Sequence, residues 1–365
     1  MEFDLRPKKL DVYIVKKFIT TFFVALLLII GIVIIFDISE KIDDFVEKRA
    51  PLNAIIFDYY LNFIPYFINM YSPLFVFVAV IIFTSKMASN SEIVAILSGG
   101  VSFHRMMVPY VVAAAIVAGL SLSLNIYVIP TSNKEKIEFE QKYMKEKPKK
   151  AVRNIHYQVA PGKFVYAESF SSWNNTAYRF TIEDIKDSKL VSKISAETAV
   201  YDTLKQCWTL NKYFIRDYND DLTDNIRSGR KLDTIIPLTV RDFYFSESVV
   251  TALTYDELNE MIRTLSMRGD SNVKFALIEK HTRFALPFSA FILTIMGVAL
   301  SSQKRRGGIG WNLALGIALA FTYILFMRFS QMFVHTDTLS PAVALWVPNI
   351  VFAFIAVFLY RMAPK

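Results

Sequence analysis

The sequence contains a single cysteine, Cys207, so no disulfide can form within the 365-residue chain. Histidine is also scarce, and the zinc-binding pattern H-E-x-x-H does not occur. The four histidines are His104, His156, His281 and His335. They are far apart in the chain, which predicts no metal site. The lone cysteine excludes a disulfide-braced fold and leaves the redox compartment open.

Motifs for nucleotide hydrolysis and nucleophilic catalysis are missing as well. The phosphate-binding pattern G-x-x-x-x-G-K-[ST] is absent, and neither "SGGVSFH" nor "RRGGIGWN" replaces it. Ser98-Gly99-Gly100 has no obvious base beside it, so a serine nucleophile is not indicated there. We therefore expect that this chain is not an enzyme and does not hydrolyse ATP by itself.

What the sequence has in abundance is apolar residues, which make up 53% of the chain, with 31 phenylalanines and a mean hydropathy of +0.34. They form charge-free runs of about 20 residues, the length that a helix needs to cross about 30 Å of hydrocarbon. The runs are Phe18–Phe36, Tyr59–Ser85, Met106–Asn133, Phe284–Gln303, Gly307–Met327 and Pro341–Tyr360. The sequence therefore predicts an α-helical integral membrane protein with six transmembrane helices.

The short connections predict how these helices are oriented. The first run is followed directly by Asp37 and has no small-x-small cleavage site, so we expect it to stay as an anchor. Lysine and arginine gather at both termini, in the second-to-third connection and in the fourth-to-fifth connection, all on one side of a six-span path. These basic residues are Arg6, Lys8, Lys9, Lys16, Lys17, Lys86, Arg105, Lys304, Arg305, Arg306, Arg361 and Lys365. Both termini are predicted to be cytoplasmic, and the net charge of +8 needs no nucleic-acid partner.

The segment between the third and fourth runs has a different pattern. Short alternating stretches such as "KFVYAESF" and "AYRFTIEDI" are separated by turn-forming pairs, which is typical of antiparallel strands. The pairs are Pro161-Gly162, Asn174-Asn175, Asp187-Ser188, Asn219-Asp220 and Ser228-Gly229. Charged helical stretches, "NKEKIEFEQKYMKEK" and "TYDELNEMIRTLSMRG", flank it. We expect an inserted periplasmic all-β domain, a sandwich or jelly roll, over residues 134–271, with membrane domains at 1–133 and 272–365.

The stretch "SNSEIVAILSGGVSFHR" lies between the second and third runs. Its pattern predicts a short amphipathic helix within residues 89–100, with Ser89 or Ser91 as the N-cap and Gly99-Gly100 as a sharp exit. Ile93, Ile96 and Leu97 would share one helical face. The helix is either an ordinary interfacial connector or a coupling helix that docks on a separate cytoplasmic engine. In the second case Glu92 is available to pair with a basic group of that engine.

Four features together resemble a known family. They are six spans with a β-rich insertion, "NSEIVAILSGGVS" after the second span, "NIYVIPTSN" closing the third, and "EKHTRFALPFSAFILTIMGVALSSQKRRGG" across the fourth. In this order they resemble the lipopolysaccharide export permeases of the LptF/LptG family. The resemblance covers nearly the whole chain and implies a jelly-roll-like β-domain.

The resemblance also implies partners and a place in the cell. Two related permeases would pair among the membrane lipids of the inner membrane of a Gram-negative bacterium. They would bind a cytoplasmic LptB-like ABC ATPase dimer and extract lipopolysaccharide from the outer leaflet. LptC- and LptA-like bridge proteins then receive the lipid in outer membrane biogenesis. The chain would bind no cofactor, and ATP with Mg would be hydrolysed by the partner ATPase.

Site residues follow from the same resemblance. Glu92 would be the coupling-helix acid, followed by Gly100, with Ile93, Ile96 and Leu97 at the same interface. "FDISEKIDD" would lie where family members meet the phosphorylated sugars, with Lys41 as the basic contact beside Asp37. Val33, Ile34, Ile35 and Phe36 depart from the basic last turn of the family's first span. The phosphate contact would therefore be made by Lys41, Lys48, Arg49 or Arg283, or the lipid A carries fewer phosphates.

The implied mechanism is physical. Removing a multi-acyl lipid from a bilayer costs about 0.8 kcal/mol per CH₂, so an external energy source is required. Pro65, Pro73 and Gly297 are places where a span bends, or else they mark a static kink or a tight contact. Phe164, Tyr166, Tyr178 and Phe180 either line the acyl-chain path of the β-domain or belong to its core.

Two other functions compete with lipopolysaccharide export. The chain could be a permease of another ABC system, or a mechanotransmission subunit that drives a periplasmic partner without carrying substrate. Either would keep the coupling helix but would not need an open apolar groove. A membrane-embedded enzyme would need paired titratable groups within the spans, and the charge-free runs contain none.

Overall fold

The computed structural model describes residues 8–144, 152–171, 173–203, 205–218, 223–243, 247–303 and 308–363. The basic residues Arg6, Lys304, Arg305, Arg306 and Lys365 lie outside these ranges, as does the Asn219-Asp220 pair. The chain divides into two compact units. The membrane unit comprises Met1–Lys145, Thr251–Tyr255 and Leu277–Lys365, and the β unit comprises Glu146–Val250 and Asp256–Ala276. The positions of the two units relative to each other are not determined.

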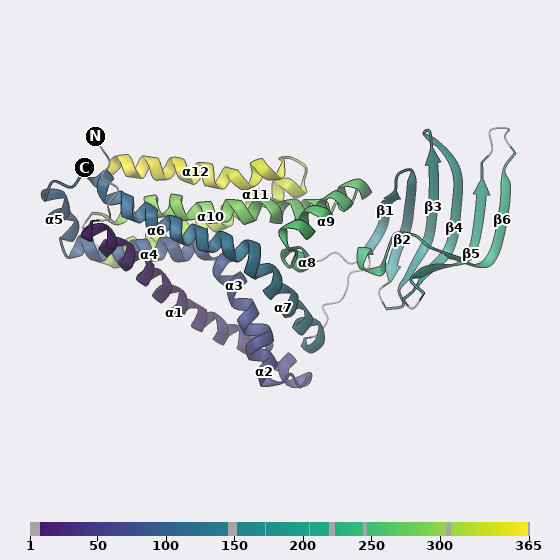
Figure 1. Cartoon of the computed structure of the whole chain (residues 1–365), viewed down its shortest axis with the longest axis horizontal. Coiled ribbons are helices and arrows are strands. Elements are labelled where there is room, and N and C mark those ends of the chain that lie inside the picture. The colour runs from purple at the N-terminus through teal and green to yellow at the C-terminus, as the bar shows by residue number, and fades with distance from the viewer. Residues whose placement is uncertain are drawn as a thin grey trace. The chain divides into compact units, whose positions relative to one another are not determined.

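The membrane unit consists of helices (Figure 1). In chain order its elements are α1 (Lys9–Glu47), α2 (Leu52–Ala54), the π-helix η1 (Ile55–Tyr60), α3 (Leu61–Met70), α4 (Ser72–Ser89), α5 (Glu92–Ser98), α6 (Phe103–Ser123), the π-helix η2 (Leu124–Val128), α7 (Ile129–Tyr143), α10 (Val273–Ser301), α11 (Gly308–His335) and α12 (Pro341–Met362). Six helical segments of the described chain are long and apolar enough to cross a membrane. The prediction of six transmembrane helices is confirmed.

The second predicted span is not one continuous helix. α3 ends at Met70, Tyr71 leaves helical geometry with φ −101° and ψ 7°, and α4 begins at Ser72. Pro73 lies in the first turn of α4, where its missing N–H is tolerated because that N–H has no helical partner in any case. Pro73 therefore marks a break in this span, whereas Pro65 lies inside α3.

Gly297 permits a close contact between helices. α10 runs through Gly297, and a Cβ atom added there would lie 2.9 Å from Cγ1 of Val80 and 3.1 Å from the ring of Phe77, both in α4. A Cβ atom at these distances would force the side chains of Val80 and Phe77 to shift, so glycine allows the closest approach of the two helices. Of the alternatives raised by the sequence, the structure shows a tight contact at this position.

Prolines inside α10 and α12 leave backbone carbonyl groups without a helical donor, and side chains of other helices donate hydrogen bonds to these carbonyls. Because proline has no N–H, the carbonyl four residues before it loses its helical donor. Pro348 frees the carbonyl of Ala344 in α12, and the hydroxyl of Ser330 in α11 donates to that oxygen. Hydrocarbon offers no water to satisfy such a group, so a neighbouring side chain is required.

α1 uses only one stripe of its surface for packing within the chain. Ile14, Phe18, Phe22, Leu26 and Ile30 recur every four residues and are buried in the main core of the membrane unit. The other faces are also apolar and remain open, as at Phe36, which is 72% exposed. Such a surface suits lipid tails or another membrane protein.

The β unit contains one six-stranded antiparallel sheet whose strands follow each other in sequence order (Figure 1). The strands are β1 (Val152–Ala160), β2 (Lys163–Ser171), β3 (Thr176–Lys186), β4 (Lys189–Asp202), β5 (Cys207–Asp217) and β6 (Asn225–Thr234). The 3₁₀ helix η3 (Val240–Phe243), α8 (Glu247–Thr251) and α9 (Tyr255–Arg268) come after the sheet in sequence. The predicted fold class, a helical membrane protein with an inserted β-domain, is confirmed.

Most of the predicted turns lie between strands, but one prediction is wrong. Pro161-Gly162, Asn174-Asn175 and Asp187-Ser188 connect consecutive strands. Ser228-Gly229 instead lies within β6, where Gly229 pairs with Tyr213 of β5. A Cβ atom on Gly229 would lie 2.6 Å from the Tyr213 hydroxyl, so this glycine makes room for a ring and does not form a turn.

The sheet has a transverse crease where ladder pairing is interrupted on every strand. At this crease one residue of each strand is left out of the pairing, and these are Asn154, Glu168, Arg179, Glu197, Lys212 and Arg230; bulges elsewhere leave out Val159 of β1 and Val191 of β4. Asn154, Arg179 and Lys212 have left-handed backbone, and ion pairs join Arg179 to Glu168 at 3.0 Å and Lys212 to Glu197 at 2.6 Å. Interrupted pairing with left-handed residues bends strands, as β-bulges do.

Candidate functional site

The predicted coupling segment forms α5, preceded by an unusual backbone conformation. Ser91 occupies the N-cap position with a φ of 62°, in the left-handed region, and its side chain caps no backbone N–H. The Ser89 hydroxyl donates to the carbonyl of Lys86 at 2.9 Å instead. Ser91 is therefore at the N-cap as predicted, but its side chain makes no capping hydrogen bond, because the left-handed turn at Ser91 replaces the extended geometry that such a bond needs.

The other end of α5 has the predicted sharp exit. The N–H of Gly100 donates to the carbonyl of Leu97 at 3.0 Å, and that of Val101 donates to the carbonyl of Ile96 at 3.3 Å. With Gly100 at a φ of 84°, these bonds form a Schellman motif, which turns the chain away from the helix axis. Ile93 is buried, and Ile96 and Leu97 pack partly buried against the same core.

Glu92 is half-buried in the first turn of α5, and both of its carboxylate oxygens accept hydrogen bonds. The hydroxyl of Tyr13 donates to Oε2 at 2.8 Å, and the amide of Asn90 donates to Oε1 at 3.1 Å. Tyr13 belongs to the first turns of α1, so the acid is tied to a helix 79 residues away in sequence. The role of Glu92 towards an ATPase stays a prediction.

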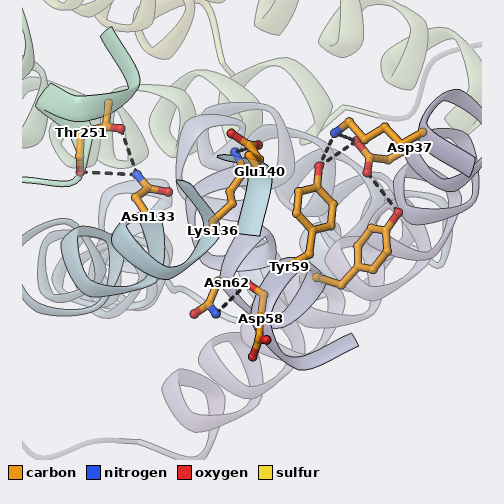
Figure 2. A network of polar contacts seen from close by, with 10 residues as sticks. Asp37, Asp58, Tyr59, Asn62, Asn133, Lys136, Glu140 and Thr251 are labelled. Atoms are coloured by element: carbon orange, nitrogen blue, oxygen red, sulfur yellow. Dashed lines mark hydrogen bonds and ion pairs between the residues drawn. The ribbon is translucent and has the colours of Figure 1, made fainter. Parts of the chain in front are cut away.

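Asp37 and Lys41 lie near the other end of α1, within a compact polar cluster (Figure 2). The ammonium of Lys41 donates to Asp37 at 2.5 Å and to the hydroxyl of Tyr59, and it lies 4.8 Å from the centre of the Tyr59 ring. The hydroxyl of Tyr60 donates to the second oxygen of Asp37 at 3.1 Å. Tyr59 and Tyr60 are consecutive residues of η1, and its π-helical winding directs both hydroxyls at Asp37.

A second lysine, Lys136 of α7, lies beside this cluster and was missed by the sequence analysis (Figure 2). Its ammonium is 5.5 Å from the centre of the Phe63 ring, and that of Lys41 is 5.8 Å from the same centre. Lys136 also pairs with Glu140 at 3.4 Å. One indication of its place was available in the sequence. Lys136 comes shortly after the third apolar run, and in a six-span path the end of that run is on the same side of the membrane as the end of the first run.

Lys48 and Arg49 are not part of this cluster. Both are exposed beyond the last turn of α1, and neither forms an ion pair with any residue that the structure describes. Arg49 has a φ of 51° and turns the chain towards α2. A role of Lys48 and Arg49 as substrate contacts stays a prediction, and such contacts would lie outside the Lys41 cluster.

Arg283 is buried and holds a backbone segment. Its side chain in α10 is 1% exposed, pairs with Glu279 at 2.9 Å and donates to the carbonyl of Leu253 at 2.8 Å. Asn133 of α7 binds the same Thr251–Tyr255 segment, donating to the hydroxyl of Thr251 at 3.0 Å (Figure 2). The guanidinium Nη1 has no partner among the described residues. Arg283 therefore anchors this segment to α10, and its role as a phosphate contact stays a prediction.

Arg328 is a further basic residue that the charge-free runs did not reveal. The fifth run stops at Met327, but the helix α11 continues to His335. Arg328 is exposed, and its guanidinium lies 3.6 Å from the sulfur of Met70 and 3.4 Å from the amide oxygen of Gln331. It forms no ion pair with a described carboxylate, and an arginine in a membrane helix generally marks a functional position.

The four predicted residues of the β unit occupy different environments. Phe180 is 1% exposed and stacks on Trp208, with ring centres 5.6 Å apart, so it is a core residue. Phe164 and Tyr178 are 37% and 39% exposed, and Tyr166 lies 4.5 Å from the ring of His156. Only the exposed residues remain available to a ligand, and their role stays a prediction.

The chain was also compared with known proteins. Residues 12–362 match the family model of the lipopolysaccharide export system permease LptF/LptG. The chain belongs to this family. LptF/LptG proteins are permeases of lipopolysaccharide export that work with other components of an ABC transporter, and they are not enzymes themselves. With its apolar helices, the chain is a multi-pass protein of the inner membrane. No curated protein matches it at a significant level.

The family assignment covers both units. Its match begins three residues after the start of α1 and ends at the last residue of α12, so the inserted β unit is included. Among the described residues of this LptF/LptG permease, no group of three or more metal-binding side chains comes together.

Proposed function

We propose that this LptF/LptG protein is one of two permeases that extract lipopolysaccharide from the outer leaflet of the inner membrane and pass it through the β unit. The observation that carries the proposal is the family match over residues 12–362. A separate cytoplasmic ATPase dimer drives the transfer, because the sequence holds no phosphate-binding loop of its own. ATP and Mg belong to that partner, and the permease binds no cofactor.

One end of the membrane unit is proposed to face the cytoplasm. The start of α1, the start of α6 and the end of α12 gather there, since Asp11 pairs with Arg105 and His104 lies 3.3 Å from the hydroxyl of Tyr360 (Figure 1). α5 lies at the same end. Because basic connections stay inside, both termini and the coupling helix are cytoplasmic in this proposal, and the β unit is periplasmic.

The Lys41–Lys136 cluster is proposed to receive a phosphate of the substrate. Two ammonium groups near one aromatic ring provide charge for an anion, and ammonium is a common phosphate partner. Lys41 is already held by Asp37 and Tyr59, so a phosphate has to compete with the Asp37 carboxylate. Arg328 is a second anion contact in this proposal, because no described carboxylate neutralises it.

The acyl chains set the need for energy and for a partner. At about 0.8 kcal/mol per CH₂, lipid extraction is strongly uphill, and the ATPase supplies the work through α5. The open apolar faces of α1 and α11 are proposed to border a cavity shared with the second permease. The bridge proteins accept the lipid from the β unit.

Site-specific photocrosslinking in cells tests the proposal. A photoreactive probe at Phe164 or Tyr178, both exposed, is expected to form lipopolysaccharide adducts, and Glu92→Lys is expected to abolish them. A probe at Trp173, which is 98% exposed in the loop between β2 and β3, serves as the position control. A folded complex with bound ATPase but without adducts would contradict lipid transfer and favour the mechanotransmission alternative.

A further inference from the structure

α1 carries a polar contact site at each end. Tyr13 near its start binds Glu92 of the coupling helix, and Asp37 near its end binds Lys41 and the η1 tyrosines. At 1.5 Å rise per residue, the helix spans about 36 Å between Tyr13 and Asp37. One helix therefore connects the cytoplasmic end of the membrane unit with the predicted anion site.

The contacts at the start of α1 are strong and directional. The guanidinium of Arg105, at the start of α6, binds both oxygens of Asp11, at 2.7 Å and 2.6 Å. Such bidentate pairs fix orientation as well as distance. The second tie is the hydroxyl of Tyr13 on Oε2 of Glu92 at 2.8 Å. α1 is thus joined both to the coupling helix and to the helix that follows it.

Apolar packing supports these two ties. Ile14 and Phe18 of α1 are 0% exposed and belong to the same core cluster as Ile93 of α5 and Phe103 of α6. Close-packed interiors transmit displacement because they contain few voids. The start of α1, α5 and the start of α6 are therefore expected to move as one block.

The remainder of α1 is suited to carry such a movement. It is continuous from Lys9 to Glu47 and contains no proline, with Gly31 as its only glycine. Other spans are interrupted: the second breaks at Tyr71, α6 continues into the π-helix η2, and α10 contains Pro287. Breaks of this kind are where helices bend. A displacement applied to α1 reaches its other end with less bending.

We propose that α1 delivers the movement of the coupling helix to the Asp37–Lys41 cluster, with Tyr13 as the positioning residue for Glu92 and the Asp11–Arg105 pair as a second tie. This inference rests on the proposed export function. Asp37 and Lys41 both belong to α1, whereas Tyr59 and Tyr60 belong to η1. A shift of α1 against η1 breaks the Lys41–Tyr59 and Tyr60–Asp37 contacts but keeps the Lys41–Asp37 pair.

The accessibility of one position near the far end of α1 tests the inference. Ser39 is exposed between Asp37 and Lys41, and the only natural thiol, Cys207, is removed by Cys207→Ser. The assembled ATPase complex carrying Ser39→Cys is reconstituted in nanodiscs and labelled with a membrane-impermeant maleimide, with and without ATP and vanadate. In this parent, the ratio of the two labelling rates is expected to differ from one.

Tyr13→Phe is the main variant, since it removes one oxygen atom and keeps the ring. It is expected to bring the ratio of labelling rates closer to one while ATP hydrolysis continues, because one of the two polar ties of α1 is lost. Tyr127→Phe is the matched control, since the Tyr127 hydroxyl bonds no described residue. Asp11→Arg should weaken the response, and Asp11→Arg with Arg105→Asp should restore it.

The outcomes separate this inference from the export function. Release of lipopolysaccharide to a soluble acceptor is measured on the same parent preparation. If the parent releases lipid and the double variant Tyr13→Phe with Asp11→Arg, which removes both polar ties, keeps the full labelling response, α1 is not the link, and the export function stands. A labelling ratio of one in a parent that transports lipid would also overturn the link. ATP hydrolysis without any lipid release would refute the export function and the inference with it.

Discussion

The side-chain amide of Asn125 donates a hydrogen bond of 3.4 Å to the carbonyl oxygen of Arg283. Pro287, four residues further along α10, has removed the helical donor of that oxygen. The side-chain oxygen of Asn125 in turn accepts from the side-chain amide of Asn69 at 2.7 Å, and the hydroxyl of Ser121 donates to the side-chain oxygen of Asn69 at 2.5 Å. A buried polar network thus joins the broken second span, the π-helix η2 and α10.

This relationship predicts a coupling between two substitutions. Asn125→Leu should destabilise the protein by about 0.6 to 1.7 kcal/mol, the range of hydrogen bonds between membrane helices. Pro287→Ala restores the missing N–H, so Asn125→Leu should cost less in that background. A double-mutant cycle of unfolding free energies in bicelles measures the difference. Equal costs in the two backgrounds would show that Asn125 does not act through the freed carbonyl.

Two glycines in membrane helices should respond oppositely to alanine. Gly297→Ala places a methyl group 2.9 Å from Val80, and overpacking of this kind costs about 1 to 3 kcal/mol. Gly31→Ala meets no atom within 4 Å and should stabilise α1 by about 0.5 to 1 kcal/mol through helix propensity. Thermal unfolding in detergent compares the two variants. A destabilised Gly31→Ala would mean that another subunit packs there.

Truncation of two aromatic residues should separate core from surface in the β unit. Phe180→Ala removes a ring stacked on Trp208 and should destabilise the unit by about 3 to 5 kcal/mol. Phe164→Ala affects a side chain that is 37% exposed and should leave folding nearly unchanged. Limited proteolysis of the full chain reports both. If Phe164→Ala also unfolds the unit, its ring is not available to a ligand.

Removal of the carboxylate that holds Lys41 should strengthen anion binding. Asp37→Asn is expected to tighten lipid A binding by at least about fivefold, the factor equivalent to about 1 kcal/mol, because that is the upper value for exposed ion pairs and this pair is largely buried. Lys41→Gln should weaken binding instead.

Asp58→Asn is the control, because its exposed side chain bonds no described residue. Binding of bisphosphorylated lipid A in nanodiscs measures all three. Weaker binding by Asp37→Asn would mean that Asp37 positions Lys41 and does not compete with phosphate.

Local sequence determined the features that depend on composition and short spacing. The six spans could be predicted because the length of an apolar run is a property of consecutive residues. The exit from α5 followed from Gly99-Gly100, and three strand turns followed from their residue pairs. Glycine at 229 misled the prediction, because a glycine that makes room for a ring has the same letter as one that turns the chain.

Tertiary structure alone decided which distant side chains meet. Nothing in the local pattern places Lys136 beside Phe63, or Tyr13 on Glu92, because such contacts depend on how helices pack against one another. Phe180 is a further example. The alternating pattern of β3 allows its side chain on either face of the sheet, and the interrupted pairing at Arg179 decides that it enters the core. The sequence determined a six-span membrane protein with an inserted β-domain, and the packing of its helices and sheet decided the partners of Lys41, Glu92 and Arg283.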